Sequence, residues 1–433
     1  MNILVHAFHI SPNRGSEFSV SWNYVLSMSK YHHLYVIVGG TSDTIGDYSD
    51  LEGLKIPNVD FIYPNIGRWF KIVYGLYQKF LWRIGWWTRY IPFRIWNNQV
   101  FQQLKLYKDL IPKIDVIHFL SPVGWHEIGY LYKLGKPCIW GPVGGFTNCQ
   151  KVFYSHYIKL KPIAIKIKNL LNTLSSACSL NLKCAMKKYD IVVANTQDNQ
   201  HFIESHFKPK KLLYFPENSM RISENEIKNI NEVVNKYDVS NKKVECIWCG
   251  TLEDRKMPIM LLDIVKRMVH KNRIHVTMVG GGYMKDYICN RVDIEKLSNV
   301  ITLCGNLPRQ EVRNYFCKSH LHLLTSSYEA NTTVMFEAME ECVPSIVFDH
   351  FGMADLVKDD ITGKKITISN YDKMCNDFAA ILDELTENPV KLKSWAMNLR
   401  EDSKQYSADK RVSFFETCYE FAIKNHYDKT TLA

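Results

Sequence analysis

Two long stretches of the N-terminal half contain no acidic residue, 61–108 and 128–189. As a result, residues 1–215 carry 25 Lys and Arg against 12 Asp and Glu, a net charge of +13. Residues 216–433 carry 29 against 32, a net charge of −3. This imbalance predicts an anionic partner for the N-terminal half only.

The chain also lacks long apolar runs and paired cysteines. No segment has 18 consecutive apolar residues, so no transmembrane helix is predicted. The first residues, Met1 to Ala7, have no basic region and indicate a buried strand rather than a signal peptide. The 12 Cys are scattered without paired spacing, which predicts buried thiols in a reducing compartment. We therefore expect a cytoplasmic location.

In place of these features, strand-like and helix-like segments alternate along 433 residues, which is long enough for two domains. This alternation predicts two doubly wound α/β domains. The stretch from Pro216 to Tyr237 is polar and lacks Gly, so we place the boundary there. We expect an N-terminal acceptor and membrane domain at 1–215, a nucleotide-sugar domain at 216–405, and a C-terminal helix and tail at 406–433.

A polar loop in the C-terminal third carries two carboxylates at a strand–helix junction. Leu321–Leu324 is predicted as a short buried strand, and the apolar pattern after the loop predicts a helix that ends before Pro344. Glu329 lies at the strand end and Glu337 about two turns into the helix. Such a junction is where a doubly wound sheet binds ligands, and free N–H groups at a helix start attract phosphate. Two solvated Glu residues at this spacing are also common.

The run from Ser326 to Gly363, with a predicted strand at Ile346–Asp349, resembles the signature of the retaining, nucleotide-sugar-dependent family 4 glycosyltransferases. The resemblance implies the GT-B fold, in which two Rossmann-like parallel-sheet domains face each other across a cleft and a C-terminal helix crosses back. It also implies sugar transfer with retention of configuration and without a metal or other cofactor. The chain has no Asp-x-Asp motif at a strand end, which weakly supports the absence of a metal.

The resemblance implies roles for the residues of this loop. Glu329 would hold the donor sugar as a catalytic residue, and Glu337 would accept hydrogen bonds from the ribose hydroxyls. The helix start at Thr332 and Thr333 would contact the donor diphosphate.

A second loop, 250–256, resembles the Gly-Arg-Leu-x-x-x-Lys element with which this family grips the donor diphosphate. Lys256 stands at the Lys position. Thr251 stands at the Arg position, and we expect Arg255 to substitute, because a guanidinium can bind phosphate with two N–H groups. The alternative is that Arg255 and Lys256 are exposed loop charges.

Two further loops are expected at the donor by the same resemblance. Gly305 and Asn306, after a predicted strand, would lie near the nucleobase. The loop Ser11–Glu17 resembles a Pro-x-x-Gly-Ser-Glu element, and Gly15 and Ser16 would close over the phosphates. From the residues alone, a plain turn between strand and helix is an equally good interpretation of that loop.

The segment Asp115–Leu120 is predicted as a strand with His118 near the carboxyl edge of the sheet. It resembles the family's Asp-Val-x-His strand end, in which a His faces the sugar and the acceptor. We therefore expect His118 to be catalytic. Leu120 stands where many members have a second His.

The segment 66–96 interleaves Lys and Arg with many aromatic residues, including Trp82, Trp86 and Trp87. Basic and aromatic residues without acids suit an anionic membrane surface. The alternatives are a pair of helices packed on the sheet, with snorkelling Lys and Arg, or a site for single-stranded nucleic acid. We expect peripheral binding to the inner face of a membrane, and no nucleic acid.

Together these features predict a glycosyltransferase that moves a sugar from a nucleotide-sugar donor to a glycan acceptor, lipid-linked, in cell-surface polysaccharide synthesis. The alternatives are a nucleotide-sugar epimerase or phosphorylase on the same fold, or a basic nucleic-acid-binding or membrane-binding protein without activity.

Overall fold

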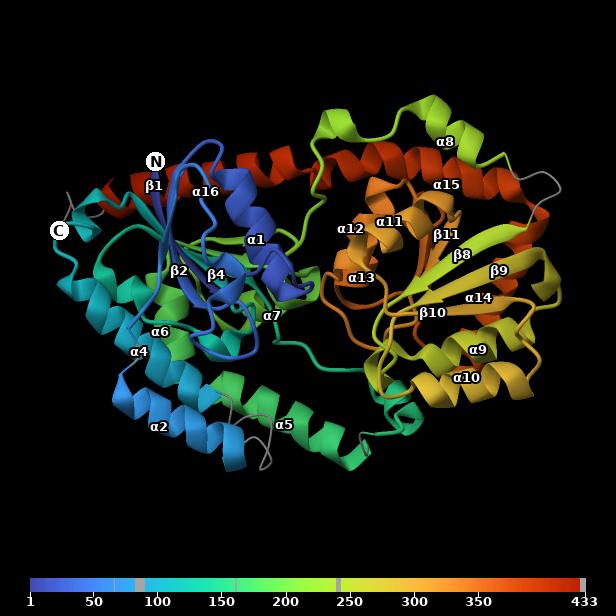
Figure 1. Ribbon diagram of the computed structural model, residues 1–433, viewed down its shortest axis with the longest axis horizontal. Helices are drawn as coiled ribbons and strands as arrows, with labels where there is room; N and C mark the ends of the chain where they lie inside the picture. The colour runs from blue at the N-terminus through green and yellow to red at the C-terminus, as the bar shows by residue number, and fades with distance from the viewer. Residues whose placement is uncertain (66, 82–89, 160–161, 239–242, 429–433) are drawn as a thin grey trace. The chain divides into compact units, whose positions relative to one another are not determined.

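The computed structural model describes residues 1–65, 67–81, 90–159, 162–238 and 243–428. By their contacts they form two units, each with its own parallel sheet (Figure 1). The first unit contains Met1–Thr147, Thr173–Glu217 and the chain from Arg411 onward, and the second contains Asn148–Asn172 and Asn218–Lys410. Residues 148–172, which we expected in the N-terminal domain 1–215, therefore belong to the second unit.

The sheet of the first unit has seven strands in the described residues, in the order β3-β2-β1-β4-β5-β6-β7. All neighbouring strands are parallel. The strands are β1 Asn2–His9, β2 His33–Gly40, β3 Val59–Ile62, β4 Val116–Ser121, β5 Cys138–Val143, β6 Ile191–Ala194 and β7 Leu212–Tyr214.

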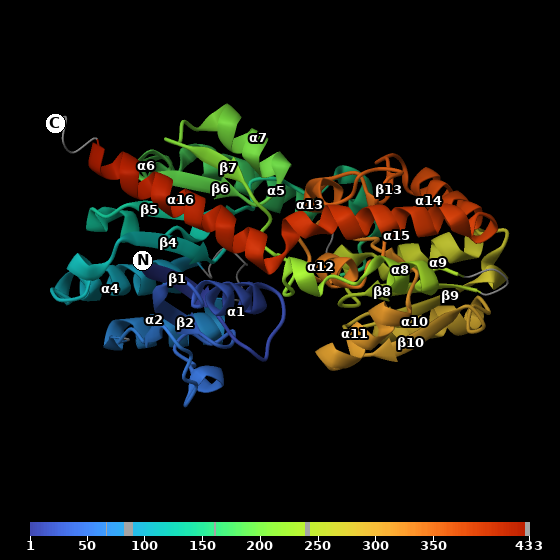
Figure 2. The ribbon, with the colours of Figure 1, turned by 90° about the horizontal axis from the view of Figure 1, so that it is seen from above.

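Helices cover both faces of this sheet, because alternate residues of each buried strand point to opposite sides. Ile3 and Val5 of β1 pack with α1 and α16, whereas Leu4 packs in the core that contains α4, α6 and α7. Figure 2 shows α16 running along the sheet of this unit. The helices are α1 Glu17–Met28, α2 Arg68–Leu76, the π-helical turn η2 Tyr77–Leu81, α4 Tyr90–Leu106, α6 Leu180–Lys188, α7 Gln197–His206 and α16 Ala408–Asp428.

The second unit has six parallel strands in its described residues, in the order β10-β9-β8-β11-β12-β13. The strands are β8 Val244–Cys249, β9 Ile274–Val279, β10 Ile301–Gly305, β11 Leu321–Leu323, β12 Ser345–Phe348 and β13 Gly363–Ile366. The strands predicted on either side of the Glu329 loop are confirmed, as β11 and β12.

Helices again cover both faces. Cys246 and Trp248 of β8 pack in the main core with α9 and α14, whereas Ile247 packs with α11 and α12. Burial of each such large side chain stabilises the fold by about 1.5–3 kcal/mol. The helices are α5 Pro162–Cys178, which continues into residues of the first unit, α8 Ile230–Lys236, α9 Pro258–Arg267, α10 Lys285–Ile294, α11 Arg309–Lys318, α12 Thr333–Glu340, α13 Phe351–Asp355, α14 Tyr371–Glu387 and α15 Pro389–Asp402.

The aromatic segment 66–96 is partly core and partly surface. Trp82, Trp86 and Trp87 lie outside the described residues. Phe93 and Trp96 of α4 are buried in the core of the first unit, as the packed-helix alternative predicts. Among the described helices, none is long and apolar enough to cross a bilayer.

Candidate functional site

The loop between β11 and α12 is bound to the loop that follows β8. The Ser327 backbone N–H and hydroxyl donate to the Arg255 carbonyl, at 2.9 and 3.0 Å. The Thr325 hydroxyl donates to the Lys256 carbonyl at 2.9 Å. Both loops follow the carboxyl ends of neighbouring parallel strands, and these bonds set their separation. They therefore place Glu329 beside the short helical turn η9 Asp254–Lys256.

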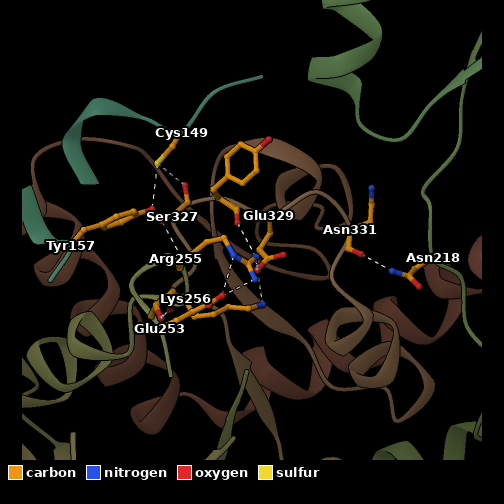
Figure 3. A network of polar contacts seen from close by, with 11 residues as sticks. Cys149, Tyr157, Asn218, Glu253, Arg255, Lys256, Ser327, Glu329 and Asn331 are labelled. Atoms are coloured by element: carbon orange, nitrogen blue, oxygen red, sulfur yellow. Dashed lines mark hydrogen bonds and ion pairs between the residues drawn. The ribbon is translucent and has the colours of Figure 1, made fainter. Parts of the chain in front are cut away.

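Glu329 is held by two cations from that turn (Figure 3). The Lys256 ammonium lies 2.5 Å from its Oε1, and the Arg255 guanidinium donates to the same oxygen. The Lys256 side chain is only 8% exposed, so it is not an exposed loop charge. Arg255 also binds Glu253 at 2.9 Å. The cluster thus brings together four charges, Glu253, Arg255 and Lys256 from one loop and Glu329 from another.

The electrostatics of this cluster fix Glu329 as an anion. Burial alone would raise the pKa of the Glu329 carboxyl, but the Lys256 and Arg255 charges outweigh burial and hold its pKa below the usual value. Burial would lower the pKa of Arg255, and Glu329 and Glu253 raise it. Each of these two charges is therefore stabilised by its neighbours, and removal of Glu329 would leave the buried Lys256 ammonium without this carboxylate.

The predicted helix start after this loop is confirmed. Thr332 is the N-cap of α12, and its side chain makes no capping hydrogen bond to the helix. Thr333 is the first helical residue. The loop is tied down just before the cap, because the Asn218 amide donates to the Asn331 carbonyl at 2.7 Å.

Glu337, two turns into α12 in the prediction, lies one turn into the observed helix. Its Oε1 accepts from the Arg221 guanidinium at 2.7 Å and from Arg309 Nε at 3.2 Å. Oε2 makes neither contact. A carboxylate that accepts on one oxygen from two guanidinium groups keeps its second oxygen as an acceptor for a further donor.

The residues predicted to contact the base lie at the end of β10, where Gly305 is the last strand residue and Asn306 follows it. Gly305 has φ +67° and its carbonyl accepts from the Gly280 N–H at 2.8 Å. A Cβ at Gly280 would lie 1.9 Å from the Gly250 carbonyl oxygen, so only Gly fits where these loops meet. Asn306 is exposed beside Gly281. Thr251 is also exposed, in the loop after β8.

In the first unit, Gly15 and Ser16 lie in the exposed loop between β1 and α1. A Cβ at Gly15 would meet no atom within 4 Å. Ser16 adopts the positive φ of 57° that is uncommon for residues other than Gly, and it starts α1. The helix start predicted after this loop is thus confirmed, and the contact with phosphate stays a prediction.

His118 does not lie at the edge of the sheet. It is the third residue of β4, paired with Val5 in the middle of the sheet, and it is fully buried. Its Nε2 donates to the Gly141 carbonyl at 2.7 Å, and its Nδ1 accepts from the Tyr419 hydroxyl at 2.7 Å. Burial lowers the pKa of its imidazole to about 3, so it is neutral. The predicted position at the end of the strand was wrong, and the catalytic role of His118 stays a prediction.

Leu120 points to the same face as His118, because residues two apart on a strand share a side. It is buried in the core with α1 and α16. A packed leucine side chain therefore occupies the position at which many members of the family have a second His.

A family model described as "Glycosyl transferases group 1" matches residues 229–429. This match covers a little under half of the chain, so residues 229–429 are similar to the group 1 glycosyl transferases. This part of the chain contains Lys256, Glu329 and Glu337.

Similar proteins extend the comparison to the rest of the chain. The amylovoran biosynthesis glycosyltransferase AmsD of Erwinia amylovora is 26% identical over 222 residues, which are 50% of this chain and 58% of AmsD. The chain thus spans a little over half the length of this relative. HepE of Anabaena, solved in complex with UDP, has a TM-score of 0.61 at 15% identity and covers 97% of this chain and 100% of its own.

A sucrose-phosphate synthase from Thermosynechococcus elongatus has a TM-score of 0.63 at 14% identity, over 97% of this chain and 98% of its own. At this identity such likenesses show the fold. The predicted fold class, two Rossmann-like parallel-sheet domains of the GT-B type, is confirmed.

Three residues at the site, Tyr157, Arg221 and Arg309, were not predicted from the sequence. Arg221 lies in the stretch interpreted only as a boundary, and Arg309 begins α11. Tyr157, in the segment 148–172, bonds with its hydroxyl to the Ser327 hydroxyl (Figure 3). No local pattern marks any of them, because each meets its partner only through the fold.

The segment 148–172 is anchored close to the same turn. The Ile158 and Lys159 N–H groups donate to the Asp254 carboxylate, at 2.7 and 2.8 Å. Phe153 is fully buried in the core of the second unit. This segment therefore braces both the 254–256 turn and the loop that carries Glu329.

Proposed function

We propose that the protein is a retaining glycosyltransferase that moves a sugar from a nucleotide-sugar donor to a lipid-linked glycan in cell-surface polysaccharide synthesis. The observation that carries the proposal is the Glu329 carboxylate, held as an anion by Lys256 and Arg255 beside the start of α12. The match of residues 229–429 to the transferase family supports it.

The geometry suits the departure of a nucleoside diphosphate. As the bond to the sugar breaks, negative charge develops on the leaving oxygen. Lys256 and Arg255 supply two positive charges, and the N–H groups at Thr332 and Thr333 add the positive end of a helix. Because these groups can stabilise the leaving group, the proposal includes no metal.

Each remaining residue has a proposed task. Glu329 orients the donor sugar next to the cations, and Oε2 of Glu337 accepts hydrogen bonds from the ribose. Gly305 and Asn306 approach the nucleobase at the end of β10. Gly15 and Ser16 close over the phosphates.

The similar proteins suggest the donor and the product class to test first. HepE has been solved with UDP and with UDP-glucose, which supports a uridine diphosphate sugar as the donor. AmsD is named for the biosynthesis of amylovoran, which supports a polysaccharide product.

We also propose that the segment 66–96 binds the inner face of an anionic membrane, where a lipid-linked acceptor would be available. Its exposed aromatic residues support this, because the side chains of Trp69 and Phe80 are 77% and 61% exposed. Aromatic side chains of this kind suit the boundary between head groups and acyl chains.

Calorimetry with a panel of nucleotide sugars tests the proposal. We expect one donor to bind, its nucleoside diphosphate to compete, and Lys256→Ala to weaken both. Lys266→Ala is the matched control, because its side chain is 60% exposed and lies in α9, away from the Glu329 cluster. If no nucleotide sugar binds, the donor assignment is wrong.

Product analysis separates the reaction classes. Incubation of the bound donor with a lipid extract should give a labelled lipid-linked product, and proton NMR should show the anomeric configuration of the donor. Conversion of the donor to another sugar nucleotide without acceptor would instead indicate an epimerase. Phosphate-dependent release of sugar phosphate would indicate a phosphorylase.

A further inference from the structure

Helix α5 turns an aliphatic face toward solvent. Its exposed large residues are Ile163, Ile167, Leu170, Leu171 and Leu174, each between 44% and 62% exposed. Their spacing of three and four residues places them on one side of the helix. Figure 1 draws α5 as one continuous helix, so these five residues, the aliphatic stripe, belong to a single helix face.

The opposite face of α5 is largely polar and packed. Asn172 is buried, and its amide donates to the Asn148 side-chain oxygen at 3.1 Å. The Asn169 amide donates to the Tyr154 hydroxyl. An ordinary surface helix buries its apolar stripe and exposes its polar residues. In α5 this arrangement is reversed, and a reversed helix indicates an apolar partner for the outer face.

The charge around the stripe indicates the nature of that partner. Lys166 and Lys168 are exposed on either side of the aliphatic residues, and residues 128–189 contain no acid. The long methylene stems of lysine can lie along an apolar surface while their ammonium groups reach anionic groups at its edge. A partner that is apolar in depth and anionic at its surface matches both features.

We propose that the aliphatic stripe of α5, residues 163–174, lies on an anionic phospholipid surface, with its Ile and Leu side chains at the acyl boundary and the flanking lysines at the head groups. A second copy of the chain is a poorer occupant, because it would bring the same acid-free lysine segments together. The proposal does not depend on the transferase assignment, and it concerns residues separate from the segment 66–96.

Vesicle flotation of the full-length protein tests this. Wild-type protein should bind mixed phosphatidylcholine–phosphatidylglycerol vesicles at low salt and release at high salt, because part of the attraction is screened charge. The double variant Ile167→Asn with Leu170→Asn should partition at least about tenfold less, because it loses two aliphatic side chains that the lipid would bury.

The matched control is Ile294→Asn with Val390→Asn, two comparably exposed aliphatic residues on α10 and α15. It should bind vesicles like the wild type. All variants should keep the wild-type thermal midpoint and far-ultraviolet dichroism, because the changed side chains face solvent. A second variant, Lys166→Glu with Lys168→Glu, keeps the stripe and should lose binding to the mixed vesicles most strongly at low salt.

Three results would overturn the proposal. In the first, the α5 double variant floats like the wild type while Trp69→Ser with Ile72→Ser abolishes binding, which assigns the lipid surface to 66–96 alone. In the second, the wild type ignores anionic vesicles at low salt. In the third, light scattering shows a dimer that the α5 variant dissociates, which identifies the stripe as an interface between copies.

Discussion

Glu329 and His118 are both predicted to be catalytic at the ends of buried strands, but the fold gives them opposite surroundings. Glu329 follows β11, in a loop where Lys256 and Arg255 reach its carboxylate. His118 lies inside β4, where the Tyr419 hydroxyl and the Gly141 carbonyl occupy both ring nitrogens. Glu329, beyond the end of its strand, lies where a ligand can reach it. His118, within the sheet, is covered by helices.

The pKa values carry the same contrast. Both side chains are buried, and burial disfavours the charged form of each. Glu329 stays charged because two cations compensate, whereas the His118 imidazole, next to the buried Arg411, is held neutral. Of these two buried groups, only Glu329 has compensating charges beside it and keeps its own charge. Five variants test this difference between the two residues and their surroundings.

The largest effect is expected from Glu329→Gln. We expect kcat to fall about a hundredfold, and by more than KM rises, because the carboxylate positions both the sugar and the two cations. Steady-state kinetics below the thermal midpoint of the variant provide the measurement. Glu253→Gln, which also contacts Arg255, is the matched control and should change kcat much less.

Glu337→Gln sharpens that result. If Glu337 holds the unreactive ribose, its loss should mainly raise the donor KM. Unchanged turnover in both Glu329→Gln and Glu337→Gln would show that the loop is not the active site.

Lys256→Ala should have the next largest effect. Loss of a charge-assisted contact with the diphosphate should weaken donor binding by roughly 1.5–3 kcal/mol. Calorimetry with the donor and with its nucleoside diphosphate measures this. If the variant binds both ligands with normal affinity, Lys256 does not contact the donor. Its ion pair with Glu329 would then serve only to stabilise the fold.

His118→Gln should change stability and not turnover. We expect a loss of about 1–3 kcal/mol of unfolding free energy, because buried hydroxyl and carbonyl partners are left poorly satisfied. The pKa of His118 is lowered in the folded state, so the unfolded chain binds the proton more readily, and wild-type stability falls as pH drops from 6.5 toward about 3.

His118→Gln has no imidazole to protonate, so its free energy of unfolding should not show this pH dependence. The difference in unfolding free energy between wild type and variant should therefore become smaller over the same pH range, as measured by denaturant titrations. A collapse of kcat at an unchanged thermal midpoint would restore His118 to the active site.

Tyr157→Phe should give the smallest effect. It removes only the hydroxyl that bonds Ser327, which costs about 0.5–1.5 kcal/mol, so kcat should fall severalfold at most. Tyr154→Phe, in the same segment but without a contact to Ser327, is the comparison. An equal loss in both variants would mean that the segment acts through stability and not through the Glu329 loop.

The two doubly wound sheets, and the position of the Glu329 loop between a strand and a helix, could be predicted from the sequence. Strand–helix alternation and the strand–loop–helix pattern around Glu329 are local, and hydrophobic periodicity reports them directly. Lys256 was predicted from the resemblance of loop 250–256 to the Gly-Arg-Leu-x-x-x-Lys element of the family.

The contacts between side chains from distant segments could be seen only in the folded structure. Arg221 and Arg309 reach Glu337 from two other segments, and Tyr157 reaches Ser327 across 170 positions. The face of the sheet on which His118 lies follows from the alternation of side chains along β4. Its partner on that face comes from α16, about 300 residues later in the chain. Hydrophobic periodicity predicts which side chains are buried. It does not predict their contact partners, because those come from distant segments whose packing cannot be recognised from the local sequence.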